Sequence, residues 1–282
     1  MTPRSWLIVP ADNEEKIAAA LGSAADAVIF DLEDSVAASE KARARDILRG
    51  LGARTAGGPS RWVRINPLES EFSGPDIGCC EELELDGLVL PKAEEGEQVR
   101  RLAMDVMEAS WRLHAMVGAT PASLFGMDSF IGAAASLTTM SCGIDDLSTA
   151  LGASSKFDAD GSLSFTYRLA RSLCLTAARA AGAQPVDGVF RDVTDVERLR
   201  REAEAARREG FTGKLAIDPS QVEVINEAFT PTAEEVAAAR AIVAAFEAEP
   251  RRGSLAVGAR LIDRPRLAQA RGVLQRAGAA KE

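Results

Sequence analysis

Short apolar runs alternate with longer segments of mixed polarity along most of the chain. The longer segments, such as EEGEQVRRLAMDVMEASW and TDVERLRREAEAARREG, repeat apolar residues every three or four positions, which is typical of amphipathic helices. The apolar runs have the length and composition of buried strands. They lie near residues 5–10, 27–32, 61–66, 87–91, 113–118, 138–144, 184–189 and 213–217. Eight strands, each with a crossover helix, favour a closed (β/α)8 barrel, or TIM barrel, over an open doubly wound α/β sheet.

The pattern changes after residue 228. The next segment begins with Thr230 and Thr232, two candidate N-caps, and then places apolar residues along one helix face. A turn, the short run SLAVGARLID and a basic last helix follow, which is more than a barrel needs to close. We therefore expect residues 1–228 to form the barrel and residues 229–282 to form a C-terminal helical extension with a lid segment. This extension either caps its own barrel or, as we expect, packs on a neighbouring subunit.

The composition excludes several classes of function. With 46% hydrophobic and 27% charged residues, and no apolar run near the roughly 20 residues of a membrane span, the chain is typical of a globular protein without a membrane segment. A net charge of −9 and the lack of a basic stripe argue against a nucleic-acid partner. The four cysteines have no metal-ligand spacing, and Cys142 and Cys174 lie in apolar surroundings. We expect a cytoplasmic protein with buried thiols.

Charged side chains follow several of the predicted strands. In a (β/α)8 barrel the carboxyl ends of the strands converge on one mouth, where the chemistry takes place. Alternation along a strand would point two of these side chains, Asp31 and Glu33, in the same direction. Arg64 offers a planar fork that binds a carboxylate at two points, and Lys92 offers a point charge. The full set is Asp31, Glu33 and Asp34 from VIFDLED, Arg64 from WVRIN, Lys92 from LVLPK, and Asp145 and Asp146 from SCGIDD.

Several of these residues also have a structural interpretation. Acidic residues behind a strand frequently cap the following helix, and Asp34 and Asp145 fit that role equally well. Arg64 could neutralise Glu33 in a structural ion pair. His114, the only histidine, precedes its strand end and fits a core or surface position, so most metal and nucleophilic-triad chemistries are excluded. Taken together, the set predicts a site where an acidic substrate is held by arginine and a divalent cation.

Longer motifs around the same residues match a known family. The chain resembles the citrate lyase beta subunit and its stand-alone relatives, the malyl-CoA and citramalyl-CoA lyases and the malyl-CoA thioesterases. DLEDSV, VRIN and LPK in that order are specific, whereas any one of them alone would be weak. The similarity covers almost the whole chain, through RSWLIVPADN at 4–13, DAVIFDLEDSV at 26–36, WVRIN at 62–66, DGLVLPKAE at 86–94, GIDDLSTALG at 143–152, PVDGVFRD at 185–192, GFTGKLAIDPSQV at 210–222 and LIDRPRLAQAR at 261–271.

The resemblance implies a (β/α)8 barrel that acts on a CoA thioester. Such an enzyme makes or breaks a carbon–carbon bond by aldol or Claisen chemistry, or hydrolyses the thioester of a short hydroxyacyl-CoA such as malyl-CoA or citramalyl-CoA. Members of the family usually hold Mg²⁺ with two carboxylates, because the ion polarises the oxygen of a 2-oxo acid while an enolate is stabilised. The resemblance further implies a homotrimer. It leaves open whether an acyl-carrier protein takes part.

The same resemblance implies roles for individual residues. Arg64 matches the arginine that clamps the carboxylate of the oxo acid, and Asp146 matches one ligand of the metal ion. Arg4 and Lys16 are candidates for binding the CoA phosphates. Asp263 matches an aspartate that completes the site of a neighbouring subunit as a general acid or base. The other charged residues at the strand ends that we expect to contact the substrate are Asp31, Glu33 and Lys92.

Two positions depart from the family pattern. The family has a metal-binding glutamate behind the fifth strand, in a pattern like IETPAG, where this chain has VGATPAS and therefore Ala119. Thr120 and Pro121 keep the register. The family also usually has histidine where this chain has Asp218. Without the glutamate, Mg²⁺ would bind weakly or not at all unless another carboxylate substitutes, for which the candidates are Asp31, Glu33 and Asp145.

Two functions are compatible with these changes. The first is a Mg²⁺-dependent lyase or thioesterase in which one of those carboxylates replaces the missing ligand. The second is a family member that binds a CoA thioester or an acidic ligand without lyase activity. A barrel aldolase for free oxo acids is disfavoured, because the similarity extends through the first segment and the tail.

Overall fold

The computed structural model describes residues 2–258 and 260–279 of the chain. The chain divides into two compact units, one formed by Pro3–Asn226 and the other beginning at Glu227. The barrel boundary expected from the sequence, residue 228, lies just beyond this division, and residues 280–282 of the expected extension lie outside the described residues.

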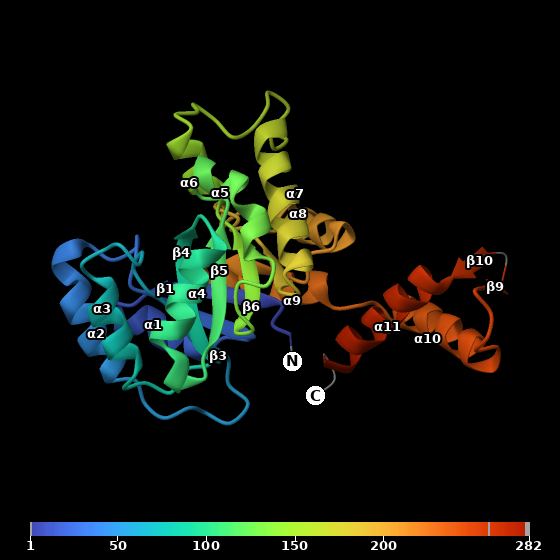
Figure 1. Ribbon diagram of the computed structural model, residues 1–282, viewed down its shortest axis with the longest axis horizontal. Helices are drawn as coiled ribbons and strands as arrows, with labels where there is room; N and C mark the ends of the chain where they lie inside the picture. Colours follow the sequence, from blue (N-terminus) through green and yellow to red (C-terminus); the bar gives the residue numbers. More distant parts are fainter. Residues whose placement is uncertain (1, 259, 280–282) are drawn as a thin grey trace. The chain divides into compact units, whose positions relative to one another are not determined.

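The first unit is a closed barrel of parallel strands that neighbour one another in chain order (Figure 1). The ring closes because β1 pairs with both β2 and β8. The strands are β1 (Ser5–Pro10), β2 (Ala27–Asp31), β3 (Ser60–Arg64), β4 (Gly87–Ala93), β5 (Arg112–Val117), β6 (Leu137–Cys142), β7 (Gln184–Asp187) and β8 (Gly213–Ala216). The prediction of a (β/α)8 barrel is confirmed.

Helices follow the strands and surround them. The α-helices are α1 (Glu14–Leu21), α2 (Lys41–Arg49), α3 (Ser73–Cys80), α4 (Gly96–Asp105), α5 (Pro121–Phe125), α6 (Ile144–Ala150), α7 (Phe165–Ala180), α8 (Val196–Glu209) and α9 (Val222–Phe229). Short 3₁₀ helices are η1 (Ala38–Glu40), η2 (Met107–Ala109), η3 (Met127–Phe130) and η4 (Pro219–Gln221). Helices α5 and α6 gather beside the first turns of α7, where Leu147 and Tyr167 share a small apolar cluster (Figure 1).

Alternate strand residues fill the interior of the barrel. Trp6 and Trp62 meet there edge to face, with ring centroids 5.0 Å apart. Gly87 makes room for them, since a Cβ at this position would lie 2.5 Å from the Trp62 ring. His114 points inward as well, with its ring 4.9 Å from that of Trp6, and so takes the core position considered for it. The remaining buried members of the interior cluster are Ala27, Ile29, Val89, Met116, Val186 and Leu215.

The second unit has a small core of its own. It contains α10 (Ala233–Ala248), an antiparallel hairpin of β9 (Ser254–Val257) and β10 (Arg260–Asp263), and α11 (Arg264–Ala279). Thr232 caps α10, where it exchanges hydrogen bonds with Glu235. Phe246, Leu255, Ile262 and Leu267 form the apolar cluster between these elements. The expected tail therefore folds as a helix, a hairpin and a last helix.

Two general properties concern the whole described chain. None of its helices, over residues 2–258 and 260–279, is long and apolar enough to cross a membrane. All four cysteines are free thiols and are buried, as the sequence predicts.

Candidate functional site

An ion pair between Asp31 and Arg64 joins the carboxyl ends of β2 and β3. The Nε and Nη2 groups of Arg64 donate to the two carboxylate oxygens of Asp31, at 2.6 and 2.5 Å. Asp31 also accepts hydrogen bonds from the Ser35 hydroxyl and from the backbone amides of Glu33 and Ser35. Burial raises the pKa of Asp31, but the charge of Arg64 and these hydrogen bonds outweigh it, so the pKa lies below its ordinary value. Asp31 is therefore an ionised group that fixes the guanidinium in place.

Glu33 connects this pair to Lys92. Its Oε2 lies 3.0 Å from Nη1 of Arg64, and its Oε1 lies 2.8 Å from Nζ of Lys92. Lys92 also contacts Asp34, at 2.7 Å. Burial raises the pKa of Glu33 above its ordinary value, against the lowering effect of the two cations. The structure thus brings together four residues that the sequence singled out, Asp31, Glu33, Arg64 and Lys92, at the exits of three neighbouring strands.

The backbone at Lys92 has an unusual conformation. Its φ angle of 46° lies in the left-handed region, which costs a residue other than glycine on the order of 1–3 kcal/mol. The pairing of β4 with β5 also shifts register between Leu90 and Ala93, on either side of Lys92. An irregularity of this kind bends a strand and turns a side chain in a new direction. Here the ammonium group reaches Glu33 and Asp34, which follow β2, across the intervening strand β3.

A buried lysine holds the loop that follows β2. Lys41, the first residue of α2, donates from Nζ to the carbonyl oxygens of Leu32 and Glu33, at 2.7 and 3.0 Å. The Nδ2 group of Asn66 donates to the same Leu32 oxygen, at 2.9 Å. Sequence reasoning missed Lys41, because a lysine at the start of a polar helix is usually exposed. The signal available was its position in the segment that follows DLEDSV.

Asp145 and Asp146 lie in the first turn of α6, behind β6. Asp145 is held at one oxygen by Lys156 and at the other by Nε of Arg191, at 2.6 Å. Burial raises the pKa of Asp145, but these two cations outweigh it and lower the pKa. The side chain of Asp146 makes no hydrogen bond or ion pair with a described residue. Burial raises the pKa of Asp146, and the charge of Lys92 is the main opposing influence, so this carboxylate faces the same mouth.

The exit of β5 is built without a charged side chain. Gly118 adopts a left-handed φ of 73°, and a Cβ there would lie 2.8 Å from the sulfur of Cys174. Ala119 follows and is buried. Thr120 then caps α5, since its hydroxyl oxygen accepts from the Ser123 amide at 3.2 Å and its hydroxyl donates to Glu94 at 2.7 Å. This strand exit is organised by backbone turns and a helix cap, and residue 119 contributes no oxygen to the mouth.

The carboxylates of the mouth are a poor set of ligands for a divalent metal ion. Each of the three predicted substitutes, Asp31, Glu33 and Asp145, already has a cation at both of its carboxylate oxygens. Among residues 2–258 and 260–279, no group of three or more His, Cys, Asp or Glu side chains is arranged to hold a metal ion. The remaining carboxylates are those of Asp146 and of Asp34, and one oxygen of Asp34 contacts Lys92. They would bind Mg²⁺ weakly, because a hard cation needs several oxygen ligands. The residues present therefore do not fit a metal ion held by two carboxylates.

Lys16 and Asp218 lie near each other behind β1 and β8. Lys16 is exposed in the first turn of α1, where its backbone amide donates to the capping side chain of Asn13. Asp218 accepts hydrogen bonds from the amide and hydroxyl of Ser220, at 2.9 and 2.6 Å. These hydrogen bonds hold the pKa of Asp218 below its ordinary value, and the charge of Lys16 adds to the effect. Lys16 is exposed at the carboxyl ends of the strands, and its expected contact with the CoA phosphates stays a prediction.

The structure corrects the expectation for Arg4. Arg4 directly precedes β1, and its guanidinium is paired with Asp26, which directly precedes β2, at 2.8 and 2.9 Å. Its carbonyl oxygen accepts from the backbone amide of Lys214, near the start of β8. These positions are at the amino ends of the strands, which is the end of the barrel opposite the mouth. Arg4 is therefore not in a position to bind CoA phosphates at the mouth.

Asp263 ends β10 in the second unit. It is exposed, and its Oδ1 accepts from the backbone amide of Arg266 in the first turn of α11, at 3.1 Å. This contact makes Asp263 a helix cap within its own unit. Its expected role at the mouth of a neighbouring subunit stays a prediction.

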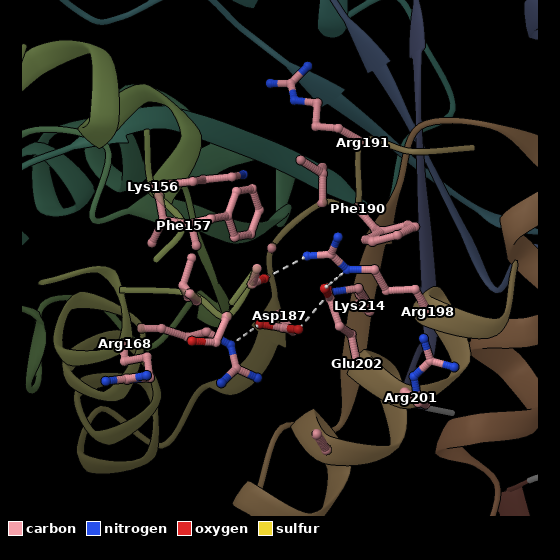
Figure 2. A pocket seen from close by; sticks show the side chains of 18 of the residues that line it. Lys156, Phe157, Arg168, Asp187, Phe190, Arg191, Arg198, Arg201, Glu202 and Lys214 are labelled. Carbon is pink, nitrogen blue, oxygen red and sulfur yellow. Dashed lines mark hydrogen bonds and ion pairs between the residues drawn. The ribbon is translucent and has the colours of Figure 1, made fainter. Parts of the chain in front are cut away.

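A cavity of about 790 Å³ lies outside the barrel, between α7 and α8. Its floor is an ion-pair network in which Asp187 contacts Arg171 at 2.6 Å and Lys214 at 2.7 Å (Figure 2). Lys156 and Arg191, the partners of Asp145, also line this cavity. None of the residues that the sequence analysis assigned to the site lines it. Sequence reasoning missed the cavity, because its walls come from two helices and two loops whose spacing along the chain has no common period.

Several known proteins are similar to this chain in sequence. The family model described as HpcH/HpaI aldolase/citrate lyase matches residues 4–219. A (3S)-malyl-CoA thioesterase of Cereibacter sphaeroides is 36% identical over 279 residues, which cover 98% of this chain and 95% of that protein. A citrate lyase subunit beta-like protein of Mycobacterium tuberculosis is 38% identical over 277 residues, which cover 98% and 96%.

Solved structures agree with these relatives. The crystal structure of CitE from Mycobacterium tuberculosis in complex with magnesium, acetoacetate and coenzyme A superposes with a TM-score of 0.81 and 36% identity, and 98% of each chain is covered. Both the barrel and the second unit are therefore included in the similarity. The chain belongs to the HpcH/HpaI aldolase/citrate lyase family.

Proposed function

We propose that this chain binds a short hydroxyacyl-CoA of the malyl-CoA or citramalyl-CoA class at the mouth of its barrel. It then either cleaves a carbon–carbon bond of the acyl group or hydrolyses the thioester. The observation that supports this best is the network of Asp31, Glu33, Arg64 and Lys92, in a chain that matches a (3S)-malyl-CoA thioesterase over 98% of its length. Two cations at a mouth with buried walls suit a substrate with a free carboxylate.

Arg64 is the proposed clamp for that carboxylate. Asp31 occupies Nε and Nη2 of the guanidinium, so it sets the orientation of the fork. Nη1 contacts Glu33 instead, at 3.0 Å. A substrate carboxylate would take the place of Glu33 at Nη1 while Asp31 keeps the guanidinium fixed. Without substrate, Nη1 of Arg64 therefore pairs with Glu33, and this ion pair is a structural contact as well.

The two reactions differ in the bond that breaks. In cleavage the substrate hydroxyl loses its proton, the carbon–carbon bond breaks, and a 2-oxo acid leaves the thioester enolate, which takes up a proton at carbon. In hydrolysis water adds to the thioester carbonyl, and the carboxylic acid and the free CoA thiol are released. In either case Asp263 of a neighbouring subunit is the proposed acid or base, and Lys16 is the proposed contact for the CoA phosphates.

A second candidate function is binding without turnover. It is favoured by Ala119, which offers no metal ligand, and by the cations that already occupy both oxygens of Asp31, Glu33 and Asp145. Such a protein would hold a CoA thioester or an acidic ligand at the same mouth. The two candidates share the binding step and differ in whether products are released.

The assembly and setting are part of the proposal. We infer a homotrimer in which the second unit of one subunit covers the mouth of the next, and we leave an acyl-carrier protein open as an alternative thioester carrier. The buried free thiols are typical of a reducing compartment, which supports the cytoplasm as the place of action.

A screen of hydroxyacyl-CoA thioesters tests this function. Released CoA thiol and released 2-oxo acid are measured separately, because oxo acid with acyl-CoA indicates cleavage and thiol without oxo acid indicates hydrolysis. We expect Arg64→Ala to lower turnover at least about 100-fold, since the clamp is lost. Arg100→Ala, which removes an exposed arginine of α4, should leave turnover unchanged. Binding of the thioesters without any product would favour the second candidate, and neither binding nor product would refute both.

A further inference from the structure

We propose that the ammonium group of Lys92 takes, in this chain, the place of a divalent metal ion, so that the mouth binds an oxo-acid or thioester oxygen without a metal. This inference rests on the proposed function and deepens it. It concerns which charge polarises the substrate, and its test does not depend on turnover.

Lys92 is held between carboxylates, as a metal ion would be. Two carboxylates that follow β2, Glu33 and Asp34, lie 2.8 and 2.7 Å from Nζ. Carboxylates hold a metal ion in a similar manner, as paired anions on one side of a cation. An ammonium group has three N–H donors, so one donor is left for an incoming oxygen. The side chain of Lys92 is 33% exposed, against 11% for Arg64, so of these two cations Lys92 is the one that a ligand reaches more easily.

The charges around Asp146 disfavour a divalent ion there. The charge of Lys92 is the largest one acting on Asp146, and Arg64 acts on it as well. A divalent ion bound at Asp146 would be repelled by these two cations. The carboxylates of Asp34 and Asp145 also act on Asp146, but Asp34 is paired with Lys92, and Asp145 with Lys156 and Arg191. Ala119 provides no second carboxylate to offset that repulsion. The ammonium group of Lys92 already supplies a positive charge at the mouth.

The backbone of β4 is irregular at Lys92. Lys92 has a left-handed φ of 46°, and the register of β4 against β5 shifts between Leu90 and Ala93. Both features cost free energy, and both serve to aim the lysine across β3 towards Glu33 and Asp34. A salt bridge on the protein surface would not require either. The backbone is therefore strained at the residue whose ammonium group has to be oriented.

The chemistry that an ammonium group supplies is charge stabilisation. When the substrate hydroxyl or the thioester carbonyl becomes an oxyanion, an N–H of Lys92 donates a hydrogen bond to it, and the proton stays on nitrogen. Hydrogen bonds to Asp34 and Glu33 raise the pKa of Lys92 against the effect of burial, so the group remains charged. No oxidant, reductant or co-reactant is needed.

The test is calorimetric binding of oxaloacetate, as an oxo-acid probe, to the full chain. Titrations are made in EDTA and again with millimolar magnesium. We expect the wild-type dissociation constant to change less than about threefold between the two conditions. Lys92→Met should weaken binding at least about tenfold in EDTA, and Lys92→Arg should retain part of the affinity. Arg100→Met serves as the matched surface control and should bind as the wild type does.

A double variant separates the role of charge from that of folding. Lys92→Met combined with Ala119→Glu removes the internal cation and restores the carboxylate that is missing, so it should bind oxaloacetate with magnesium and lose binding in EDTA. Single Ala119→Glu should raise the affinity for Mg²⁺ itself. Wild-type binding that requires magnesium would overturn the inference and leave the proposed function standing. Metal-independent binding together with no thioester turnover would support Lys92 and refute the enzymatic proposal.

Discussion

His114 is the only histidine of the chain and lies inside the barrel, where Nε2 is 2.7 Å from the hydroxyl oxygen of Ser141. Burial, with a contribution from the charge of Arg64, lowers its pKa from 6.5 to about 3. In the unfolded chain the ring regains its ordinary pKa. Between these two values the unfolded state binds a proton that the folded state does not bind, so acidification lowers the free energy of unfolding.

This difference gives a prediction on stability. Between about pH 7 and pH 5, the free energy of unfolding should fall by about 2 kcal/mol through His114, because the interval below 6.5 spans about 1.5 pH units at about 1.4 kcal/mol each. Urea unfolding at several pH values measures the effect. We expect His114→Asn to be less stable at neutral pH and to lack this slope. Parallel pH profiles for the variant and the wild type would contradict the lowered pKa of His114.

At the scale of residues, the sequence predicted the centre of the mouth and missed its surroundings. Alternation along a strand was expected to point Asp31 and Glu33 in the same direction. β2 ends at Asp31 and Glu33 lies in the loop that follows, yet both carboxylates contact Arg64. The partners of Asp145 could not be predicted, because Lys156 and Arg191 come from loops behind β6 and β7 and meet only in the fold. The ion pair of Arg4 was missed for the same reason, since Asp26 belongs to the next strand.

At the scale of elements, the loop behind β2 depends on the buried amine of Lys41. Lys41→Met removes the donor to the carbonyl oxygens of Leu32 and Glu33, so we expect a loss of about 2–3 kcal/mol in the free energy of unfolding. Because the loop also sets Glu33 against Lys92, oxaloacetate binding should weaken while the fold persists. Urea unfolding and calorimetry check the two effects.

The matched control for Lys41 lies on the same helix. Arg43 is exposed, and among the described residues it pairs only with Glu40, at 3.3 Å, so Arg43→Met should change stability by less than about 0.5 kcal/mol. Rescue of binding by Lys41→Arg, with stability partly restored, would indicate that the donor positions the loop. Normal binding by a destabilised Lys41→Met protein would limit the residue to a structural role.

The strands were predictable as elements because their apolar runs are continuous and their turns are short. The residues at which the strands end were less predictable. The run at 61–66 ends as a strand at Arg64, and the run at 138–144 ends at Cys142, because the following residues turn to start loops and helices. The exit of β5 is the clearest case, since a left-handed glycine and a threonine cap shape it and neither is part of an apolar pattern.

At the scale of the whole molecule, the proposed trimer makes a prediction on mixed assemblies. If Asp263 acts at the mouth of a neighbour, the two variants can together form an intact site. The Asp263→Ala subunit supplies a mouth with Arg64, and the neighbouring Arg64→Ala subunit supplies Asp263. Random exchange of the two inactive variants in equal amounts should restore about one quarter of the sites. Turnover after mixing and exchange measures this, and Arg64→Ala exchanged with itself is the control. Exchange that is confirmed by mass spectrometry without recovery of turnover would place Asp263 outside the neighbour's site.

The sequence predicted the architecture of the molecule, but it did not predict the cavity. Eight strand signals determined the barrel, and the extra helical pattern after the last of them indicated the second unit. The cavity between α7 and α8 depends on how far apart two helices lie, which no single helix encodes. Its floor of Asp187, Arg171 and Lys214 is charged and buried, a combination that local hydropathy does not predict.

The exit of β5 has a consequence for the history of this gene. Gly118 makes the turn and Thr120 caps α5, so the backbone there does not depend on the residue between them. Alanine codons of the form GCA or GCG become the glutamate codons GAA or GAG by a change of the second base. One base change at codon 119 would therefore restore the carboxylate that the metal site lacks, whereas removal of the competing ammonium group of Lys92 would take a second change.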